Sequence, residues 1–488
     1  MLIIKVAPPA FKWVGVLALL ALSAQAVLAS DLPPSAARAL RAAGIPESSV
    51  GVVVQEIGQS RPSLALNAGA PMNPASTMKL VTTYAALERL GLGFRWRTEA
   101  YLDGENLVLR GTGDPNLNYE AFWMLLRNLR GRGLREIHGD IVLDRSYFAP
   151  VQYEPFDNDV YRPYNVTPDA LLVNFRSVHF TFLPEGEKGV RIYAEPALPG
   201  LTVVNSLKIT DGACPEGRAF RDLLQAAFHP RPPLASFTGA YPESCGERDM
   251  NVALYEPGDY LEGLVRELWA ELGGTWSGKL REGEASRSAR LVYTHESEPL
   301  AIAVRDINKF SNNVMARQLF LTLGAELAGP PAQPDKAARA VREWLKEKAL
   351  SMPELVMENG SGLSRVARIS PAHLNALLQA AWRSAVMPEF VASLPVVAVD
   401  GTMKKRLKDE AVAGHAHIKT GLLSDARAMA GYVIDRRGRR YTVVMIVNHA
   451  RAPQADAAMD ALLSWIYSGS AGRGIPTASR PAASSRRP

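Results

Sequence analysis

The segment Asn73-Pro74-Ala75-Ser76-Thr77-Met78-Lys79-Leu80 (NPASTMKL) decides the fold that we expect for this chain of 488 residues. Its first four residues read as a turn, and apolar residues then recur at helical spacing over 77–90 until Gly91 ends the pattern. Ser76 is therefore expected at or near a helix N-terminus. Residues three apart on a helix are neighbours, so the amine of Lys79 is within reach of the Ser76 hydroxyl.

This pair has the chemistry of an activated nucleophile. A serine hydroxyl needs a base, and a lysine can serve if burial or a neighbouring cation lowers its pKa. The positive end of the helix favours a developing anion at the attacking oxygen, and backbone amides there can stabilise a tetrahedral intermediate. Ser76 is the candidate nucleophile and Lys79 its candidate base.

Two further motifs follow in the chain, Ser311-Asn312-Asn313 (S-x-N) and Lys419-Thr420-Gly421 (K-T-G). Ser311 could relay a proton, and the Asn313 amide could orient the substrate or Lys79. Lys419 lies on a predicted strand that ends at a glycine, where a substrate backbone can approach closely. Two lysines near one pocket suit a substrate carboxylate, and each lowers the pKa of the other.

The three motifs carry weight as an ordered set. Average composition gives roughly two S-x-x-K matches and one S-x-N match by chance in a chain of this length, but only about a tenth of a K-T-G match. In this order, with Ser76 opening a helix and Lys419 on a strand, the set indicates an acyl-transfer site. The same trio characterises serine β-lactamases and penicillin-binding proteins.

The distribution of helical and β patterns on either side of these motifs predicts a discontinuous catalytic domain. Residues 30–96 and 291–468 are rich in helical patterns, whereas 97–290 consists mainly of short β runs separated by turn residues, indicating a β-rich insertion of two nested subdomains. A polar, basic tail of 469–488 is expected to lack structure. The predicted helices cover 36–43, 77–90, 119–129, 260–272, 311–327, 334–348, 371–385 and 453–467, and the main predicted strands cover 50–55, 428–434 and 441–447.

Composition and charge exclude several classes of protein. The chain is 47% hydrophobic and 21% charged, with a mean hydropathy of −0.05, which is typical of globular domains. Its net charge of +6 is confined to the ends, because residues 1–29 carry +2 and residues 469–488 carry +4. The neutral body lacks the basic face that nucleic-acid binding requires.

The N-terminus has the pattern of a secretory signal peptide, residues 1–29. Lys5 and Lys12 precede an apolar run, and Ala24-Gln25-Ala26 and Val27-Leu28-Ala29 are candidate cleavage sequences. We favour cleavage after Ala29 and a periplasmic mature protein, with membrane association at most peripheral. An uncleaved anchor is the alternative, although the apolar run is short for a span.

The cysteine and histidine content favours a disulfide and no metal. Cys214 and Cys245 are the two cysteines, and in an oxidising compartment they favour one disulfide over two buried thiols. His415 and His417 have the spacing of two ligands on one strand face. No third ligand is evident, so a strand-surface pair is the simpler interpretation.

Longer strings around the motifs resemble a known family, the low-molecular-mass penicillin-binding proteins of serine peptidase family S13. These are the D-alanyl-D-alanine carboxypeptidases and endopeptidases called penicillin-binding protein 4. The matching strings cover almost the whole mature chain: NPASTMKL (73–80), GTGDP (111–115), FSNNVMARQL (310–319), NGSGLSR (359–365), DGT (400–402) and IKTG (418–421). The family's long insertion between the first two motifs corresponds to the 235 residues from Ser76 to Ser311.

The resemblance implies a fold and a catalytic set. The fold is an α/β transpeptidase-like domain, an antiparallel sheet between helices, interrupted by β-rich inserted domains. Ser76 would be acylated with Lys79 as its base, and Ser311 and Asn313 would complete the proton transfers. Lys419 acts beside them, and no cofactor is needed.

The resemblance also implies how substrate is held. Lys419 with Thr420 would bind the terminal carboxylate of a peptidoglycan stem peptide, beside Gly421, and Arg365 would face the stem. The backbone amides of Ser76 and Leu422 would form the oxyanion hole. The family usually has Ser or Thr where this chain has Leu422, so a hydroxyl that could assist the carboxylate is missing.

Three functions remain open at this level. A serine D-alanyl-D-alanine carboxypeptidase or endopeptidase would form an acyl-enzyme and be inhibited covalently by β-lactam antibiotics. A β-lactamase would share the nucleophile but deacylate quickly, and the E-x-x-L-N motif of class A enzymes is not evident. A catalytically weak envelope protein would keep the pocket only to bind peptides. Leu422 favours this function because it lacks the hydroxyl that the family usually has at this position.

Overall fold

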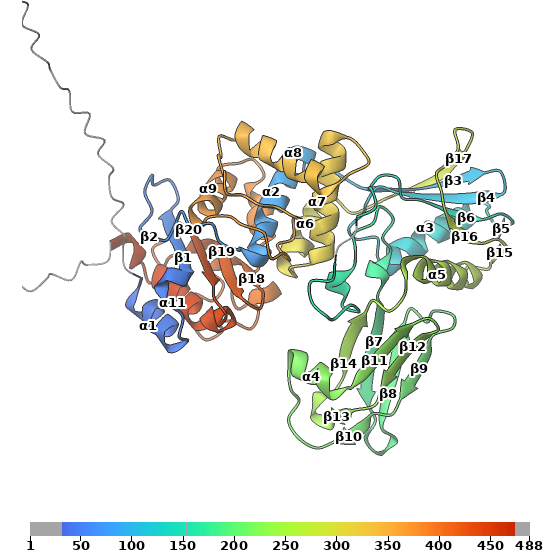
Figure 1. Ribbon diagram of the computed structural model, residues 1–488, viewed down its shortest axis with the longest axis horizontal. Helices are drawn as coiled ribbons and strands as arrows, with labels where there is room; N and C mark the ends of the chain where they lie inside the picture. The colour runs from blue at the N-terminus through green and yellow to red at the C-terminus, as the bar shows by residue number, and fades with distance from the viewer. Residues whose placement is uncertain (1–31, 152–153, 474–488) are drawn as a thin grey trace, which may run out of the picture.

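A computed structural model describes residues 32–151 and 154–473 of the chain (Figure 1). The predicted signal peptide and residues 474–488 of the predicted tail lie outside the described residues. The sheets form three groups. The chain's first and last described helices lie together in the lobe at the left of Figure 1. Within the described ranges, no helix is both long and apolar enough to cross a membrane.

The first lobe is built on a five-stranded sheet in which every neighbouring pair is antiparallel, in the order β18-β19-β20-β1-β2. Side chains of β20 alternate between its faces, as the two-residue period of a strand requires. Val443, Met445 and Val447 join one hydrophobic core, and Val444 and Ile446 join another. The strands are β1 Val50–Glu56, β2 Leu64–Leu66, β18 Ala416–Leu422, β19 Ala426–Ile434 and β20 Arg440–Asn448.

Helices cover both faces of this sheet, as the family resemblance implies. On one face, α1 and α11 pack side by side, and the other face carries the remaining helices of the lobe. The two covering helices are α1 Pro34–Ala42 and α11 Asp456–Tyr467. The others are α2 Lys79–Leu90, α6 Leu300–Lys309, α7 Asn313–Ala328, α8 Pro334–Glu347, α9 Pro371–Trp382 and α10 Met387–Ala392.

Two helices depart from the predicted pattern around the S-x-N motif. The sequence did not reveal α6, and the helix predicted over 311–327 begins at Asn313 instead. Ser311 has a positive φ of 57°, which breaks the helical path, and the Asn312 side chain caps α7 by accepting from the backbone N–H of Met315 at 3.1 Å. Ser311 is therefore held in a turn rather than within a helix.

The second lobe contains a mixed five-stranded sheet in the order β16-β6-β4-β3-β17, packed against α3 and α5. The boundary predicted at 290 is six residues early, because β17 pairs with β3 and belongs to this sheet. The elements are β3 Arg97–Asp103, β4 Asn106–Gly111, α3 Tyr119–Gly131, β5 Glu136–Ile137, β6 Ile141–Asp144, α5 Pro257–Glu271, β15 Thr275–Trp276, β16 Leu280–Glu282 and β17 Arg290–Glu296.

The third group, residues 178–252, lies in the chain between β6 and α5, and we call it the distal module. Phe180, Phe182 and Phe237 pack edge to face at its centre and continue into the core of the second lobe. Its elements are β7 Val178–Pro184, β8 Val190–Glu195, β9 Thr202–Asn205, β10 Lys208–Thr210, α4 Gly217–Leu223, β11 Ala226–Pro230, β12 Pro233–Phe237, β13 Ala240–Pro242 and β14 Arg248–Val252.

The beginning of the predicted tail is part of the first lobe. Residues Ala471–Arg473 form a 3₁₀ turn, and Ala471 is buried in the core beside α11. The Arg439 side chain donates to the carbonyl of Gly469 at 3.2 Å. The expectation that structure ends at 468 was therefore wrong by at least five residues, because polar composition does not reveal these tertiary contacts.

Cys214 and Cys245 form the disulfide that their even number favours. It closes a span of 31 residues within the distal module. A loop of this length is stabilised by about 3–4 kcal/mol through the entropy that the cross-link removes from the unfolded chain.

Replacing both cysteines by serine is expected to loosen the distal module alone. Hydrogen exchange measured by mass spectrometry should accelerate in peptides from β9 to β14, since their local unfolding becomes easier. Peptides from β1 and β20 of the same sample are the control and should keep their wild-type rates. Unchanged exchange throughout the distal module would contradict a stabilising role.

Candidate active site

Lys79 and Ser76 meet at the start of α2. Ser76 lies in the 3₁₀ turn Ala75–Met78, and the Lys79 Nζ is 2.9 Å from its Oγ. The same Nζ lies 2.6 Å from the Asn313 Oδ1 and 2.6 Å from the Ser361 carbonyl oxygen. The two carbonyl oxygens can only accept a hydrogen bond, whereas the serine hydroxyl can also donate one. A neutral Lys79 amine can therefore donate to both carbonyls and present its lone pair to the Ser76 hydroxyl.

Burial makes the neutral form of this amine the favoured one. The Lys79 side chain has no solvent exposure, and its three hydrogen-bonding partners carry no charge. Its pKa is lowered well below the ordinary value of 10.5, first by burial and then by the positive charges of Lys419 and Arg317. The sequence predicted that burial and a second lysine would lower this pKa, and the structure adds the charge of Arg317.

The turn that carries Ser76 is fixed by one asparagine. The Asn73 Oδ1 accepts from the backbone N–H of Ala75 at 2.9 Å, which supports the positive φ of 45° at Ala75. The Asn448 side-chain amide accepts from the backbone N–H of Asn73 at 2.7 Å and donates to the Asn73 carbonyl at 2.9 Å, and the Asn73 Nδ2 donates to the Ser364 carbonyl. The turn is thus tied both to β20 and to the loop that supplies Ser361.

The K-T-G motif enters from the other side on β18. The Lys419 Nζ donates to the Ser311 Oγ at 2.9 Å and to the Thr420 carbonyl at 2.7 Å. Lys419 is fully buried, and burial, followed by the charge of Arg427, lowers its pKa to about 7. Two buried lysines are therefore each bonded to a serine hydroxyl, and the two serines are partly exposed.

Gly421 is required by the chain itself. A Cβ added there would lie 2.9 Å from the backbone N of Ser76 and 2.9 Å from the carbonyl of Pro74. The sequence suggested that this glycine lets a substrate approach, but the closest approach is that of the turn Ala75–Met78. The contact sets β18 against the nucleophile's turn and leaves Leu422 at its end, 54% exposed.

Thr402 is a site residue to which sequence reasoning gave no role. Its Oγ1 lies 2.7 Å from the Oγ1 of Thr420. Asp400, two residues earlier, pairs with the nearly buried Lys309 at 2.6 Å and fixes this 3₁₀ turn. The DGT string was the available signal, but nothing in one sequence shows that it meets the K-T-G strand.

The remaining candidates lie away from the two lysines. The Arg365 guanidinium lies 4.7 Å above the Phe156 ring and is exposed. His417 is not the surface residue that we expected, because its Nδ1 lies 3.2 Å from the Val391 carbonyl and burial lowers its pKa. His415 packs against the ring of Tyr467. Over residues 32–151 and 154–473, no cluster of three or more ligand side chains could hold a metal.

Comparison with known proteins agrees with this geometry. The sequence profile described as the D-Ala-D-Ala carboxypeptidase 3 (S13) family matches residues 35–466. The D-alanyl-D-alanine carboxypeptidase DacB of Haemophilus influenzae is 24% identical over 419 residues, which cover 83% of this chain and 86% of that protein. A D-alanyl-D-alanine carboxypeptidase of an Actinomadura species is 26% identical over 88% of this chain and 83% of its own length.

Solved structures share the fold. The crystal structure of penicillin binding protein 4 from Haemophilus influenzae superposes with a TM-score of 0.72 at 22% identity, over 88% of this chain and 99% of that one. The same protein complexed with a β-lactam gives a TM-score of 0.69, also at 22% identity, over 89% and 99% of the two chains. Since the family profile spans nearly all the described residues, this chain belongs to the D-Ala-D-Ala carboxypeptidase S13 family.

Proposed function

We propose that this member of the carboxypeptidase family uses Ser76 to cleave the D-Ala-D-Ala end, or a D-amino-acid cross-link, of peptidoglycan stem peptides. The observation that carries the proposal is the environment of Lys79. Its amine is buried, touches the Ser76 hydroxyl at 2.9 Å and has two carbonyl oxygens as its other partners. This arrangement leaves a neutral amine one direction for its lone pair, toward the hydroxyl proton.

Acylation follows from these positions. Lys79 takes the hydroxyl proton while the Ser76 oxygen attacks the peptide carbonyl carbon, and the carbonyl oxygen becomes negative in the tetrahedral intermediate. The backbone N–H groups of Ser76 and Leu422 stabilise that oxygen. Collapse breaks the C–N bond, and the proton that Lys79 took passes through the Ser311 hydroxyl, which Lys419 contacts, to the nitrogen of the departing D-alanine, so that Lys79 is neutral again. The product is an ester on Ser76.

Deacylation and inhibition use the same groups. Water gives a proton to Lys79, attacks the ester and releases the shortened peptide, so that Ser76 regains its hydrogen. A penicillin presents a strained amide and a carboxylate in place of the peptide, and its opened ring stays attached. Its adduct then blocks the path of water, which makes β-lactams covalent inhibitors of this site.

Recognition of the terminal carboxylate is assigned to Lys419 and Thr420. The Thr420 hydroxyl is held by Thr402 at 2.7 Å, so its direction is fixed by the fold. Leu422 supplies no hydroxyl beside them. In this chain the charge of Lys419 and the Thr420 hydroxyl therefore bind the carboxylate. Relatives with Ser or Thr at the position of Leu422 have a second hydroxyl for this purpose.

We assign this chemistry to the predicted catalytic unit of residues 30–96 and 291–468, except that residues 291–296 of β17 join 97–290 in the inserted part. The secretory pattern of residues 1–29 and the disulfide support export to the periplasm. A β-lactamase is the less favoured function, because the three partners of Lys79 are neutral and none is a carboxylate that could activate water.

Intact-mass analysis after benzylpenicillin tests the proposal. One persistent adduct is expected on the wild-type chain and on Ser60→Ala, which alters an exposed serine outside the site, whereas Ser76→Ala should gain none. Clearance of the adduct within seconds would identify a β-lactamase. Absence of an adduct on the wild-type chain would contradict an acyl-enzyme site and favour a binding protein.

Thr402→Val tests the carboxylate site separately. Loss of one neutral hydrogen bond costs about 1 kcal/mol, so the KM of a peptide ending in D-Ala-D-Ala should rise about fivefold with little change in kcat. Thr402→Ser keeps the hydroxyl and should restore the wild-type KM. A fall in kcat at unchanged KM, or no rescue by serine, would contradict this positioning role.

A further inference from the structure

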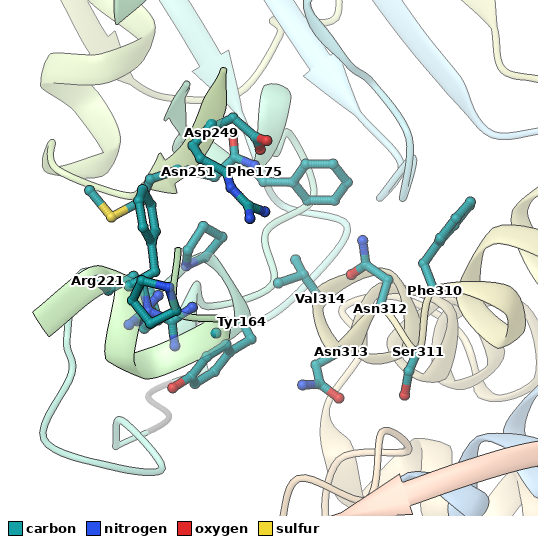
Figure 2. A pocket seen from close by; sticks show the side chains of 17 residues that line it. Tyr164, Phe175, Arg221, Asp249, Asn251, Phe310, Ser311, Asn312, Asn313 and Val314 are labelled. Carbon is teal, nitrogen blue, oxygen red and sulfur yellow. The ribbon is translucent and has the colours of Figure 1, made fainter. Parts of the chain in front are cut away.

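A cavity borders the turn that carries Ser311 and Asn313, and both residues line it. Its volume is about 580 Å³, and it separates the first residues of α7 from α4 and β14 of the distal module. Figure 2 shows Ser311, Asn312 and Asn313 on one side of the cavity and Arg221, Asp249 and Asn251 on the other. A ligand in the cavity would therefore lie beside the S-x-N motif, whose Ser311 and Asn313 contact Lys419 and Lys79.

Positive charge dominates the lining of this cavity. Arg162, Arg221 and Arg248 contribute three guanidinium groups, and Asp249 contributes one carboxylate. Arg162 is already bonded to the carboxylate of Asp159. The other two arginines have no ion pair with the residues that the structure describes.

Each of these two arginines has one buried nitrogen without a hydrogen-bond partner among the described residues. The Nε of Arg221 and the Nε of Arg248 are both shielded from solvent and make no hydrogen bond within residues 32–151 and 154–473. Burial lowers the pKa of Arg221, and the nearby charge of Arg162 adds to this effect. A buried donor without an acceptor is costly, so a ligand with acceptor oxygens would be favoured here.

The wall around the arginines is fixed by covalent and ionic contacts. The disulfide joins Cys214, next to the lining residue Pro215, to Cys245 near β14. An Arg248 nitrogen lies 3.3 Å from the Cys214 sulfur. Glu216 pairs with Lys405 of the catalytic lobe at 2.8 Å. Arg248 is thus held beside the disulfide, across from α7.

We propose that the cavity binds a carboxylate group of the second stem peptide in a cross-linked substrate, with Arg221 and Arg248 as its anchors. Guanidinium groups match carboxylates in a two-pronged geometry. Phe310 at the rim is 66% exposed, and Phe220 lines the wall, which offers apolar contact for the adjoining chain. By binding this carboxylate, the cavity favours cross-linked peptides over uncross-linked ones. This inference rests on the proposed function.

The test compares three substrates on purified protein. They are a diacylated tripeptide ending in D-Ala-D-Ala, a cross-linked stem-peptide dimer, and the same dimer with its side carboxylates amidated and its terminal carboxylates free. For Arg221→Gln/Arg248→Gln, kcat/KM on the acidic dimer relative to the tripeptide should fall at least about tenfold. The amidated dimer, which has already lost the anchored group, should show no such fall.

Arg218→Gln is the matched control, because this arginine lies on α4 but does not line the cavity and its side chain is 87% exposed. It should keep the wild-type ratio. If the double variant misfolds, Arg221→Gln alone decides, since this exchange removes no hydrogen bond or ion pair among the described residues.

Two outcomes overturn the inference. One is that the arginine variants keep the wild-type ratio of kcat/KM on the acidic dimer to kcat/KM on the tripeptide. The other is that kcat/KM falls equally on the acidic and amidated dimers, which would mean that the cavity does not recognise the charge of the carboxylate. Failure of the proposed function is distinguishable, because the wild-type chain would then form no adduct with benzylpenicillin before any dimer is tested.

Discussion

Burial of the side chains of Lys79 and Lys419 beside the two site serines is the constraint on which the rest of this structure depends. Removing an ammonium group from water costs several kcal/mol unless the charge is compensated, and neither Lys79 nor Lys419 has a carboxylate within its hydrogen-bonding set. Lys79 responds by losing its proton, which makes it a base. Lys419, with its pKa at about 7, stays charged through the lower part of the neutral range.

This arrangement weakens the fold at neutral pH. For both lysines the pKa is lower in the folded chain than in the unfolded one, so the unfolded chain binds more protons and stability rises with pH up to the ordinary lysine range. The surrounding lobe compensates through its large apolar cores on either side of the first sheet. The site is thus stabilised by packing around it rather than by ion pairs within it.

Close backbone contacts hold the two lysines in register. Gly421 lets β18 lie against the turn of Ser76, and Gly362, with a positive φ of 76°, lets its loop pass the carbonyl of Ala75 at a distance that a Cβ would not permit. Those contacts bring together residues more than 280 positions apart, as in the hydrogen bond from Lys79 to Ser361. The catalytic spacing is therefore a property of three segments at once.

Local patterns predicted what depends on local chemistry. The spacing of Ser76 and Lys79 on a helical turn, the strand over 441–447 and the S-x-N and K-T-G motifs were all readable, because short-range patterns and neighbour geometry determine them. Family resemblance supplied the antiparallel sheet between helices and the oxyanion hole. Contacts that only the tertiary fold creates were not readable, and these include the Ser361 carbonyl, the Thr402 hydroxyl and the pairing of β17 with β3.

The break before α7 shows why boundaries failed near the site. Apolar spacing alone carries a helix through Ser311, but its positive φ and the Asn312 cap end one helix and begin another. The residue that must reach Lys419 is placed by this interruption. The chain forms a turn at Ser311 rather than a continuous helix. This turn is tolerated because the Asn312 cap offsets the helical hydrogen bonds that are lost.

The division of charge between the lysines is tested most directly by the pH dependence of acylation with benzylpenicillin and with its methyl ester, which lacks the carboxylate. Both rates should fall in acid as Lys79 gains a proton. Above about pH 7, where Lys419 loses its charge, only the rate with benzylpenicillin should fall. Identical profiles for the two compounds, or acylation that begins only near the ordinary lysine pKa, would contradict the account.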